Sequence, residues 1–128
     1  MRKAIARQYL KLLQAGATSA IIDLFAEVAL VHSPLYGSQS ATSFYTALNE
    51  DTNASAIILN GIFEESETGQ IAIYFQYKWT LKNEAIVIFD VVDILTFNES
   101  NQIIALKIIY DTVKSRDLVR KLKADKSQ

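Results

Sequence analysis

One stretch of the chain, residues 86–97, constrains the fold more than any other. Ten of its twelve residues are β-branched, leucine or aromatic, which is the composition of a β-strand. Both alternating faces are apolar, so the strand is expected in the middle of a sheet with both faces covered. Phe89 and Asp93 share one face, whereas Asp90 lies on the other. Because an unpaired buried carboxylate costs several kcal/mol, these aspartates should be hydrogen-bonded, neutral or beside a wet cavity.

The composition of the chain argues against several classes of protein and site. The chain has 128 residues, with 13 Lys and Arg against 14 Asp and Glu, so we expect one domain over residues 1–128 and no nucleic-acid partner. It has no cysteine and one histidine, which argues against disulfides, a thiolate nucleophile and a histidine-based metal site. The four glycines are scattered, so no glycine-rich phosphate loop is present. Neither a metal nor a cofactor is expected.

The apolar runs are too short and too interrupted for a membrane protein. Spanning a bilayer takes roughly 20 apolar residues, and no stretch approaches that length. The N-terminus opens with Met1-Arg2-Lys3, but Arg7 and Lys11 interrupt any apolar run after it, unlike a signal peptide. We therefore expect a cytoplasmic protein without a membrane partner.

The first half of the chain predicts three helices and one short strand. Apolar positions at helical spacing precede Gly16, which suits a helix stop. Thr18 or Ser19 can cap a short second helix that forms a hairpin with the first, and Ser40 or Thr42 can cap a third. The helices are expected at residues 3–15, 18–25 and 40–53, and the strand at residues 28–33, followed by a loop from Pro34.

The second half predicts a meander of long strands. Four strand-like segments at residues 54–65, 70–81, 85–97 and 102–113 are separated by short polar turns, which implies antiparallel pairing. Strands this long should bend, so the sheet is expected to curl around the helices. Residues from Lys114 onward are a charged tail of one or two helical turns. Helices first and a curled sheet afterwards indicate an α+β fold.

Three segments carry a resemblance to a known family. Residues 9–16, 24–34 and 92–98 are similar to the nuclear transport factor 2-like proteins, which include ketosteroid isomerase and the SnoaL-like polyketide cyclases. The resemblance extends over nearly the whole chain and implies a cone-shaped sheet wrapped around the N-terminal helices, with a conical pocket inside.

The resemblance also assigns site residues. Tyr9 matches the tyrosine of an oxyanion site, and Asp93 matches an aspartic acid held neutral to donate a second hydrogen bond. The general base of the isomerases, an aspartate directly before the proline, is replaced by Ser33, whose hydroxyl is no base near neutral pH. His32 is adjacent, but neighbouring strand residues point to opposite faces.

Each of these residues also has a purely structural interpretation. Tyr9 suits the core face of an amphipathic helix, and Asp93 could bond a tyrosine for structure alone. Tyr36 and Phe44 fall where a lid over the pocket would be, or simply pack. Asp111 could line the cavity or pair with a basic residue of the tail. The candidate catalytic residues are thus Tyr9, Asp93 and His32, and the candidate ligand-binding residues are Ser33, Tyr36, Phe44, Phe89 and Asp111.

Three functions are compatible with this pattern. The first is a small-molecule-binding protein that takes an apolar ligand. The alternative is an isomerase, cyclase or lyase acting on a carbonyl compound, with Tyr9 and Asp93 stabilising an oxyanion. The third is a protein-binding scaffold. A homodimer through the outer face of the sheet is also expected, because three helices can cover only one face of a strand that is apolar on both.

Overall fold

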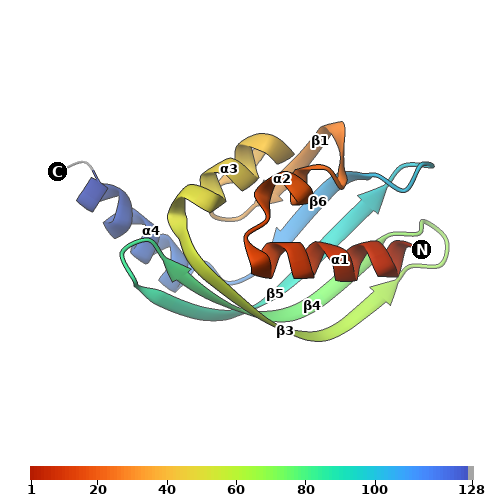
Figure 1. Ribbon diagram of the computed structural model, residues 1–128. Helices are drawn as coiled ribbons and strands as arrows, with labels where there is room; N and C mark the ends of the chain where they lie inside the picture. The colour runs from red at the N-terminus through yellow and green to blue at the C-terminus, as the bar shows by residue number, and fades with distance from the viewer. Residues whose placement is uncertain (127–128) are drawn as a thin grey trace.

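The computed structural model describes residues 1–126 and shows a six-stranded sheet curled around the N-terminal helices (Figure 1). The strand order is β2-β1-β6-β5-β4-β3. The helices are α1 (Arg2–Ala15), α2 (Thr18–Ile22), α3 (Ala41–Asp51) and α4 (Val113–Lys126). The strands are β1 (Phe25–Ser33), β2 (Gly37–Ser40), β3 (Thr52–Glu64), β4 (Ile71–Leu81), β5 (Ile86–Phe97) and β6 (Ile103–Ile109). The expected α+β class and curled sheet are confirmed.

The strands β3 to β6 form the predicted antiparallel meander. In β4 every second residue from Ile71 to Leu81 is buried, and in β5 the buried positions include Val91, Asp93 and Leu95. Ile73 pairs with Asp93 across the two strands. Since side chains alternate between faces, this register places the aromatic side chains of β4 and the carboxyl of Asp93 on the same concave face.

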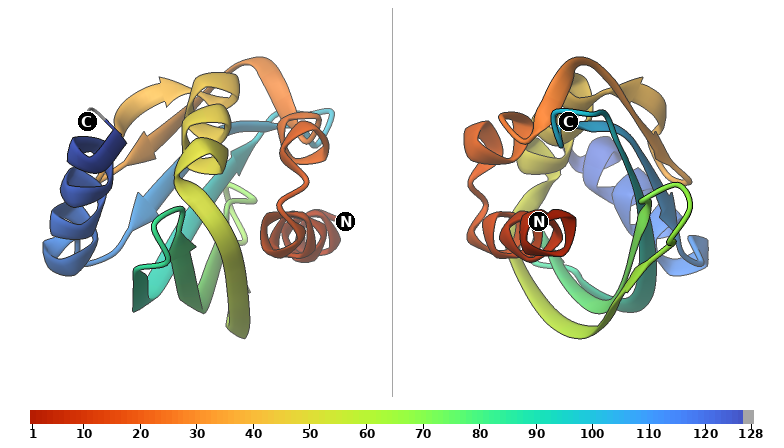
Figure 2. Two further views of the ribbon diagram at one scale, coloured as in Figure 1. Left: turned by 60° about the vertical axis from the view of Figure 1, so that its left-hand side comes forward. Right: turned by 90° about the vertical axis from the view of Figure 1, so that its right-hand side faces the viewer.

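The curl of the sheet brings α1 against the edge strand. A register shift between Leu59 and Gly61 bends β3, as expected of a bulge in a long strand. Figure 2 shows the sheet passing beneath α1 and rising on its far side. The side chain of Gln14 accepts a hydrogen bond from the backbone N–H of Ile57 (2.7 Å), so α1 satisfies a donor on a strand edge that would otherwise be open.

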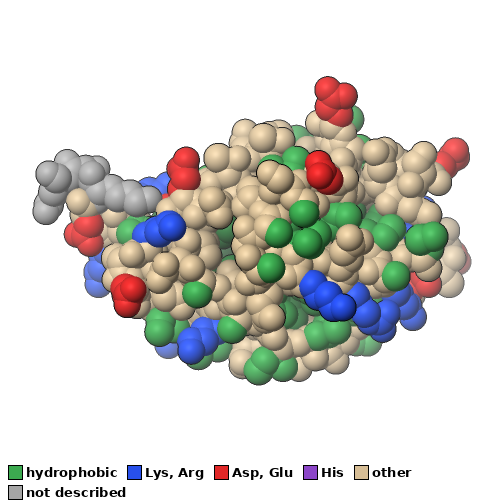
Figure 3. All heavy atoms as spheres, in the orientation of Figure 1, with side chains coloured by type: hydrophobic (Ala, Val, Ile, Leu, Met, Phe, Trp, Pro, Cys, Tyr) green, Lys and Arg blue, Asp and Glu red, His purple; other side chains and the backbone are tan. Residues whose placement is uncertain are grey.

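The first and third helices begin and end close to where the sequence indicates. Gly16 adopts φ 69° and its N–H reaches the last carbonyls of α1, the left-handed stop that glycine permits. Ser40 caps α3 by accepting from the N–H of Ser43 (3.1 Å). On the solvent side of α1, Lys3, Arg7 and Lys11 are exposed, and basic side chains gather along this helix in the space-filling view (Figure 3).

Four expectations from the sequence are wrong. The segment Gly37–Ser40, expected as loop, is the strand β2 and pairs with β1. The charged tail is a helix of 14 residues, α4, rather than one or two turns. The second helix ends at Ile22, and Phe25 already begins β1. In addition, β6 ends at Ile109 rather than at residue 113.

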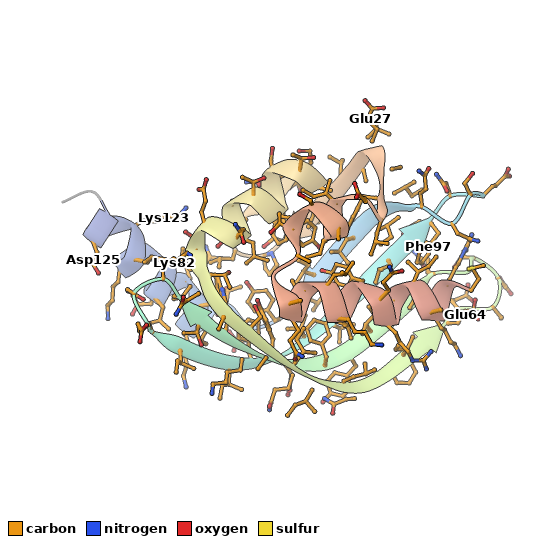
Figure 4. All side chains as sticks on the ribbon, viewed as in Figure 1. Glu27, Glu64, Lys82, Phe97, Lys123 and Asp125 are labelled. Carbon is orange, nitrogen blue, oxygen red and sulfur yellow. The ribbon has the colours of Figure 1, made fainter. Side chains whose placement is uncertain are left out.

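The first strand joins the sheet in a way that a meander does not anticipate. It pairs with β6 in parallel, through Val31 and Leu106. Between Phe25 and Leu30 the register shifts, and the intervening residues bulge outward. Glu27 projects from this bulge away from the body of the protein (Figure 4).

The last helix lies at one end of the curled sheet (Figure 1). Val119 and Leu122 are its buried apolar residues. The guanidinium of Arg116 donates to the carbonyl of Pro34 (3.0 Å), and the ammonium of Lys123 lies over the ring of Tyr36 at 5.8 Å. α4 therefore packs against the turn that follows β1. No helix among residues 1–126 is long and apolar enough to cross a membrane.

Candidate functional site

A cavity lies between α1, α3 and the concave face of the sheet. The centre of a water molecule can reach about 50 Å³ of it. It is lined by Tyr9, Leu13, Ser33, Tyr36, Phe44, Leu48, Phe75, Tyr77, Trp79, Phe89, Val91, Asp93, Ile108 and Tyr110. A cavity of this size holds a few water molecules or a small ligand.

Asp93 is the carboxyl group of this lining. Its side chain is 2 % exposed, and its Oδ1 atom is buried with no hydrogen-bond partner among the described residues. Burial removes water from the charged form and raises the pKa of Asp93 to about 8. The group is therefore mostly protonated at neutral pH. A buried polar atom left without a partner is rare in folded proteins and calls for an explanation.

Tyr9 projects from the buried face of α1 into the same cavity. Its hydroxyl lies 2.6 Å from the hydroxyl of Tyr45 on α3, and both side chains are buried. Burial raises the pKa of both phenols well above the ordinary value, so both stay protonated. When Tyr45 donates to Tyr9, the Tyr9 proton remains free for a ligand. The structure thus brings Tyr9 and Asp93 to one cavity, with Tyr45 as the partner of Tyr9.

The turn after β1 contributes to the cavity lining. The Oγ of Ser33 accepts hydrogen bonds from the N–H groups of Leu35 (3.1 Å) and Tyr36 (3.0 Å), which holds the turn. The hydroxyl of Tyr36 donates to the carboxylate of Asp51 at the end of α3 (2.6 Å). Ser33 and Tyr36 therefore line the cavity from a turn that is hydrogen-bonded on both sides.

Two of the candidate residues lie outside the cavity lining. The Nδ1 of His32 is 2.8 Å from the Oγ of Ser38 on β2, toward solvent. Asp111 is exposed and accepts from the N–H of Val113 at the start of α4. The other ligand-binding candidates, Phe44 and Phe89, line the cavity with Ser33 and Tyr36.

Aromatic rings make up most of the wall. Tyr36 and Phe44 meet at 89° with ring centres 5.6 Å apart, and Tyr77 and Phe89 meet at 83° at the same distance. Phe89 also stacks on Tyr110 at 4.5 Å. Perpendicular rings of this kind leave both ring edges and ring faces at the cavity surface.

The polar groups in this aromatic wall are largely satisfied by the protein. The hydroxyl of Tyr77 lies 2.7 Å from the Oγ of Ser55, and the indole N–H of Trp79 donates to the Oγ1 of Thr52 (2.8 Å). Burial raises the pKa of Tyr77 to about 12. Among the fully buried side-chain polar atoms that the structure describes in this wall, the Oδ1 of Asp93 is the one without a hydrogen-bond partner.

The sequence does not mark several of these residues as part of a site. Tyr77 and Trp79 lie at alternate positions of a strand-like segment, as packing residues do, and Asp51 lies in the polar end of a helix. Asp51 is in fact 3 % exposed. The spacing of Tyr77 and Trp79 matched the inward face of β4, but only the register with β5 places them beside Asp93.

No cluster of three or more potential metal-ligating side chains occurs among the described residues. The cavity lining contains no lysine, arginine or histidine and only one carboxyl group. These groups can donate, accept and stack around a small organic molecule. The lining has too few carboxylate or imidazole donors to ligate a metal.

Comparison with known proteins identifies the fold of this chain. No family model and no curated protein matches this sequence. Among solved structures, an NTF2-like protein of unknown function from Exiguobacterium sp. 255-15 is 15 % identical and matches with a TM-score of 0.71 over 83 % of this chain and 97 % of that chain. The chain has the nuclear transport factor 2-like fold.

Other solved structures share this fold. A candidate SnoaL-like polyketide cyclase from Shewanella putrefaciens CN-32 is 10 % identical, with a TM-score of 0.74 over 94 % of this chain and 86 % of that chain. SalBIII, an epoxide hydrolase/cyclase-like enzyme of pyran ring formation in the polyether salinomycin, is 19 % identical, with a TM-score of 0.72 over 86 % and 90 %. At these identities the likeness concerns the nuclear transport factor 2-like fold alone, and the expected cone-shaped sheet is confirmed.

Proposed function

We propose that this protein binds a small, mostly apolar molecule in the cavity, with Asp93 as the polar anchor. The observation that carries this proposal is the Oδ1 of Asp93, buried without a partner in the wall of an aromatic cavity. Leaving such an atom unpaired costs about 1–3 kcal/mol, which a ligand that bonds to it would recover. Binding sites of this type are apolar with a few well-placed polar groups.

The only tryptophan of the chain, Trp79, lines this cavity and provides the assay. Small apolar probes should change its fluorescence and shift the signal of its indole N–H in a saturable way. Mass spectrometry of the protein purified under native conditions should reveal any copurifying molecule. Leu48→Phe, which would fill the lining from α3, should weaken binding, whereas Thr46→Phe on the exposed side of the same helix should not. Saturable binding that is unaffected by Leu48→Phe would place the ligand elsewhere.

A second candidate function is an isomerase, cyclase or lyase that acts on a carbonyl compound. The favouring observation is that Tyr9 and the protonated Asp93 line one cavity and could both donate to a developing oxyanion. Ser33 offers no base at the position that the resemblance assigns to one. Deuterium exchange next to the carbonyl of a small ketone, followed by NMR, tests this function. Exchange no faster than with Tyr9→Phe would exclude a role for the tyrosine.

We also propose a homodimer through the outer face of the sheet. This face exposes Phe63 on β3, Tyr74 on β4, Ile88 on β5 and Ile109 on β6, with exposed fractions of 38–59 %. Tyr74 and Ile109 both flank Val92 in the register. An apolar strip across four strands is the kind of surface that a second copy covers.

Sedimentation velocity at tens of micromolar should show a dimer. Tyr74→Glu should produce the monomer, because it places a charge beside Val92 in the row that links β4, β5 and β6. Val28→Glu is the matched control, since Val28 is 86 % exposed on the β1 bulge and outside the strip. A monomeric parent protein at these concentrations would contradict the proposal.

A further inference from the structure

The cavity of this protein has an unusual balance of groups. Eight of its lining residues are aromatic, one is a carboxylic acid, and none is basic. The titratable groups that face Asp93 come from four different elements and are all phenols: Tyr9 from α1, Tyr45 from α3, Tyr77 from β4 and Tyr110 directly after β6. Burial raises the pKa of each, so none competes with Asp93 for a negative charge near neutral pH.

From this balance we propose that the cavity takes a small organic cation of the alkylammonium class, enclosed by the aromatic rings and paired with the carboxylate of Asp93. The proposal rests on the proposed ligand-binding function and names the class of ligand. Aromatic faces attract cations through the ring quadrupole, most strongly where water is excluded. A cation would also supply the opposite charge that the buried Asp93 lacks within the protein.

The geometry of the rings supports a cation over a neutral ligand. The pairs Tyr36–Phe44 and Tyr77–Phe89 are each nearly perpendicular, so they form adjoining walls rather than one stack. The ammonium of Lys123 on α4 lies 5.8 Å from the centre of the Tyr36 ring, so this ring already has a cation at one side. Figure 4 labels Lys123. A methylated ammonium is weakly hydrated in comparison with a primary one, so the free energy needed to remove its water is lower when rings enclose it.

The size of the cavity indicates a small ion. The room open to the centre of a water molecule is about 50 Å³, which corresponds to about three to five water positions. An ion with a trimethylammonium head suits this space, whereas a multi-ring molecule would need the walls to move. The wall at Tyr36 is held in place by hydrogen bonds to Ser33 and Asp51.

The binding of such an ion is coupled to a proton. In the free protein Asp93 holds its proton up to about pH 8. The carboxylate forms when the cation enters, and the proton leaves to solvent. Affinity for a permanent cation should therefore increase as pH rises from 6 to 9 and level off above the pKa of the free protein, by up to about tenfold per pH unit in the steep part.

Three probes with one carbon frame provide the test. Choline is the cation, 3,3-dimethylbutan-1-ol replaces its nitrogen with carbon, and 3,3-dimethylbutan-2-one offers a carbonyl in a similar volume. Titrations at pH 6, 7, 8 and 9 are followed by Trp79 fluorescence and by the indole N–H signal. We expect choline to bind at least about tenfold more tightly than either neutral probe at pH 9, and this preference to diminish at pH 6.

Variants provide the controls. Asp93→Asn should abolish both the preference for choline and its pH dependence. Asp90→Asn, which removes a carboxylate from the exposed side of the same strand, should leave both unchanged. The pH series on the unmodified protein tests the inference even if Asp93→Asn does not fold.

The outcomes separate this inference from the proposed function. Neutral probes that bind as tightly as choline, at every pH, would overturn the cation proposal and leave the proposed apolar binding site standing. Tighter binding of the ketone would favour carbonyl chemistry instead. If none of the three perturbs Trp79, both the cation and the small-ligand site are refuted.

Discussion

The buried carboxyl of Asp93 predicts a stability that decreases as pH rises. Its pKa in the folded protein is raised from 3.8 to about 8, whereas in the unfolded chain the group is hydrated and titrates near its ordinary value. Between these two values the unfolded chain loses the proton and the folded chain keeps it, so the free energy of unfolding falls with pH. One group contributes about 1.4 kcal/mol per pH unit, which amounts to about 4 kcal/mol by pH 7.

Replacing Asp93 with Asn removes this titration. At pH 4 the variant should be less stable than the parent protein by about 1–3 kcal/mol, because the amide brings an additional donor into an apolar wall. The difference should reverse as pH rises, so that near pH 7 the variant is the more stable protein. Urea unfolding followed by circular dichroism from pH 4 to 8, at one protein concentration, measures both curves.

Asp90→Asn is the matched control for this experiment. Asp90 lies on the exposed side of the same strand, so this variant reports the loss of a carboxylate without any change in the cavity. An Asp93→Asn protein that becomes steadily less stable than the parent as pH rises would show that Asp93 is ionised and paired. That result would refute the proposal that Asp93 is a neutral acid in the folded protein.

Further predictions concern the elements that position the cavity. Ser40→Ala removes the side-chain cap of α3 and should cost about 1 kcal/mol in urea unfolding; an unchanged midpoint would mean that water replaces the cap. Tyr45→Phe leaves the Tyr9 hydroxyl without its partner, and in a double-mutant cycle Tyr9→Phe with Tyr45→Phe should cost less than the two single changes together; additive costs would show no coupling between the hydroxyls. Gly69 has φ 73° and any Cβ would overlap the guanidinium of Arg2, so Gly69→Ala should lower the melting temperature, and less so in an Arg2→Ala background.

The central strand shows what a sequence pattern can predict. The alternation in residues 86–97 placed Asp93 with Val91 and Leu95 on one face and Asp90 on the other, and the structure has this arrangement. Period-two alternation is a local property of the chain, so it can be read from the sequence. Which face turns inward depends on which side of the sheet the helices cover, and this is not a local property of the strand.

The elements that sequence reasoning missed are stabilised by distant parts of the chain. The residues of β2, Gly-Ser-Gln-Ser, have little strand propensity, and they extend because β1 offers hydrogen-bonding partners. Most residues of α4 are charged, and two of its few apolar residues, Val119 and Leu122, are buried. Its contact with Pro34 spans 82 positions of sequence, which no local pattern reports.

The same distinction applies to the candidate site. Tyr9 and Asp93 were expected to share a cavity, and both line it. The partner of Tyr9 could not be predicted, because the pairing with Tyr45 depends on how α1 and α3 are placed relative to each other. Likewise, Asp51 lies in a polar stretch, and its burial beneath Tyr36 arises from the packing of the turn after β1.

The parallel pairing of β1 with β6 has a consequence for how the protein assembles in time. Val31 pairs with Leu106 although most of the chain lies between them in sequence. The chain must lose the entropy of closing this long loop before it gains the contact. The hairpins between β3 and β6 involve short turns and can form early. During synthesis β1 can therefore pair with β6 only after β6 has left the ribosome, and the turn with Ser33 and Tyr36 that follows β1 cannot be held in its place in the cavity wall before then. Until then the aromatic wall is open to water, and a newly made chain exposes it to chaperones and proteases.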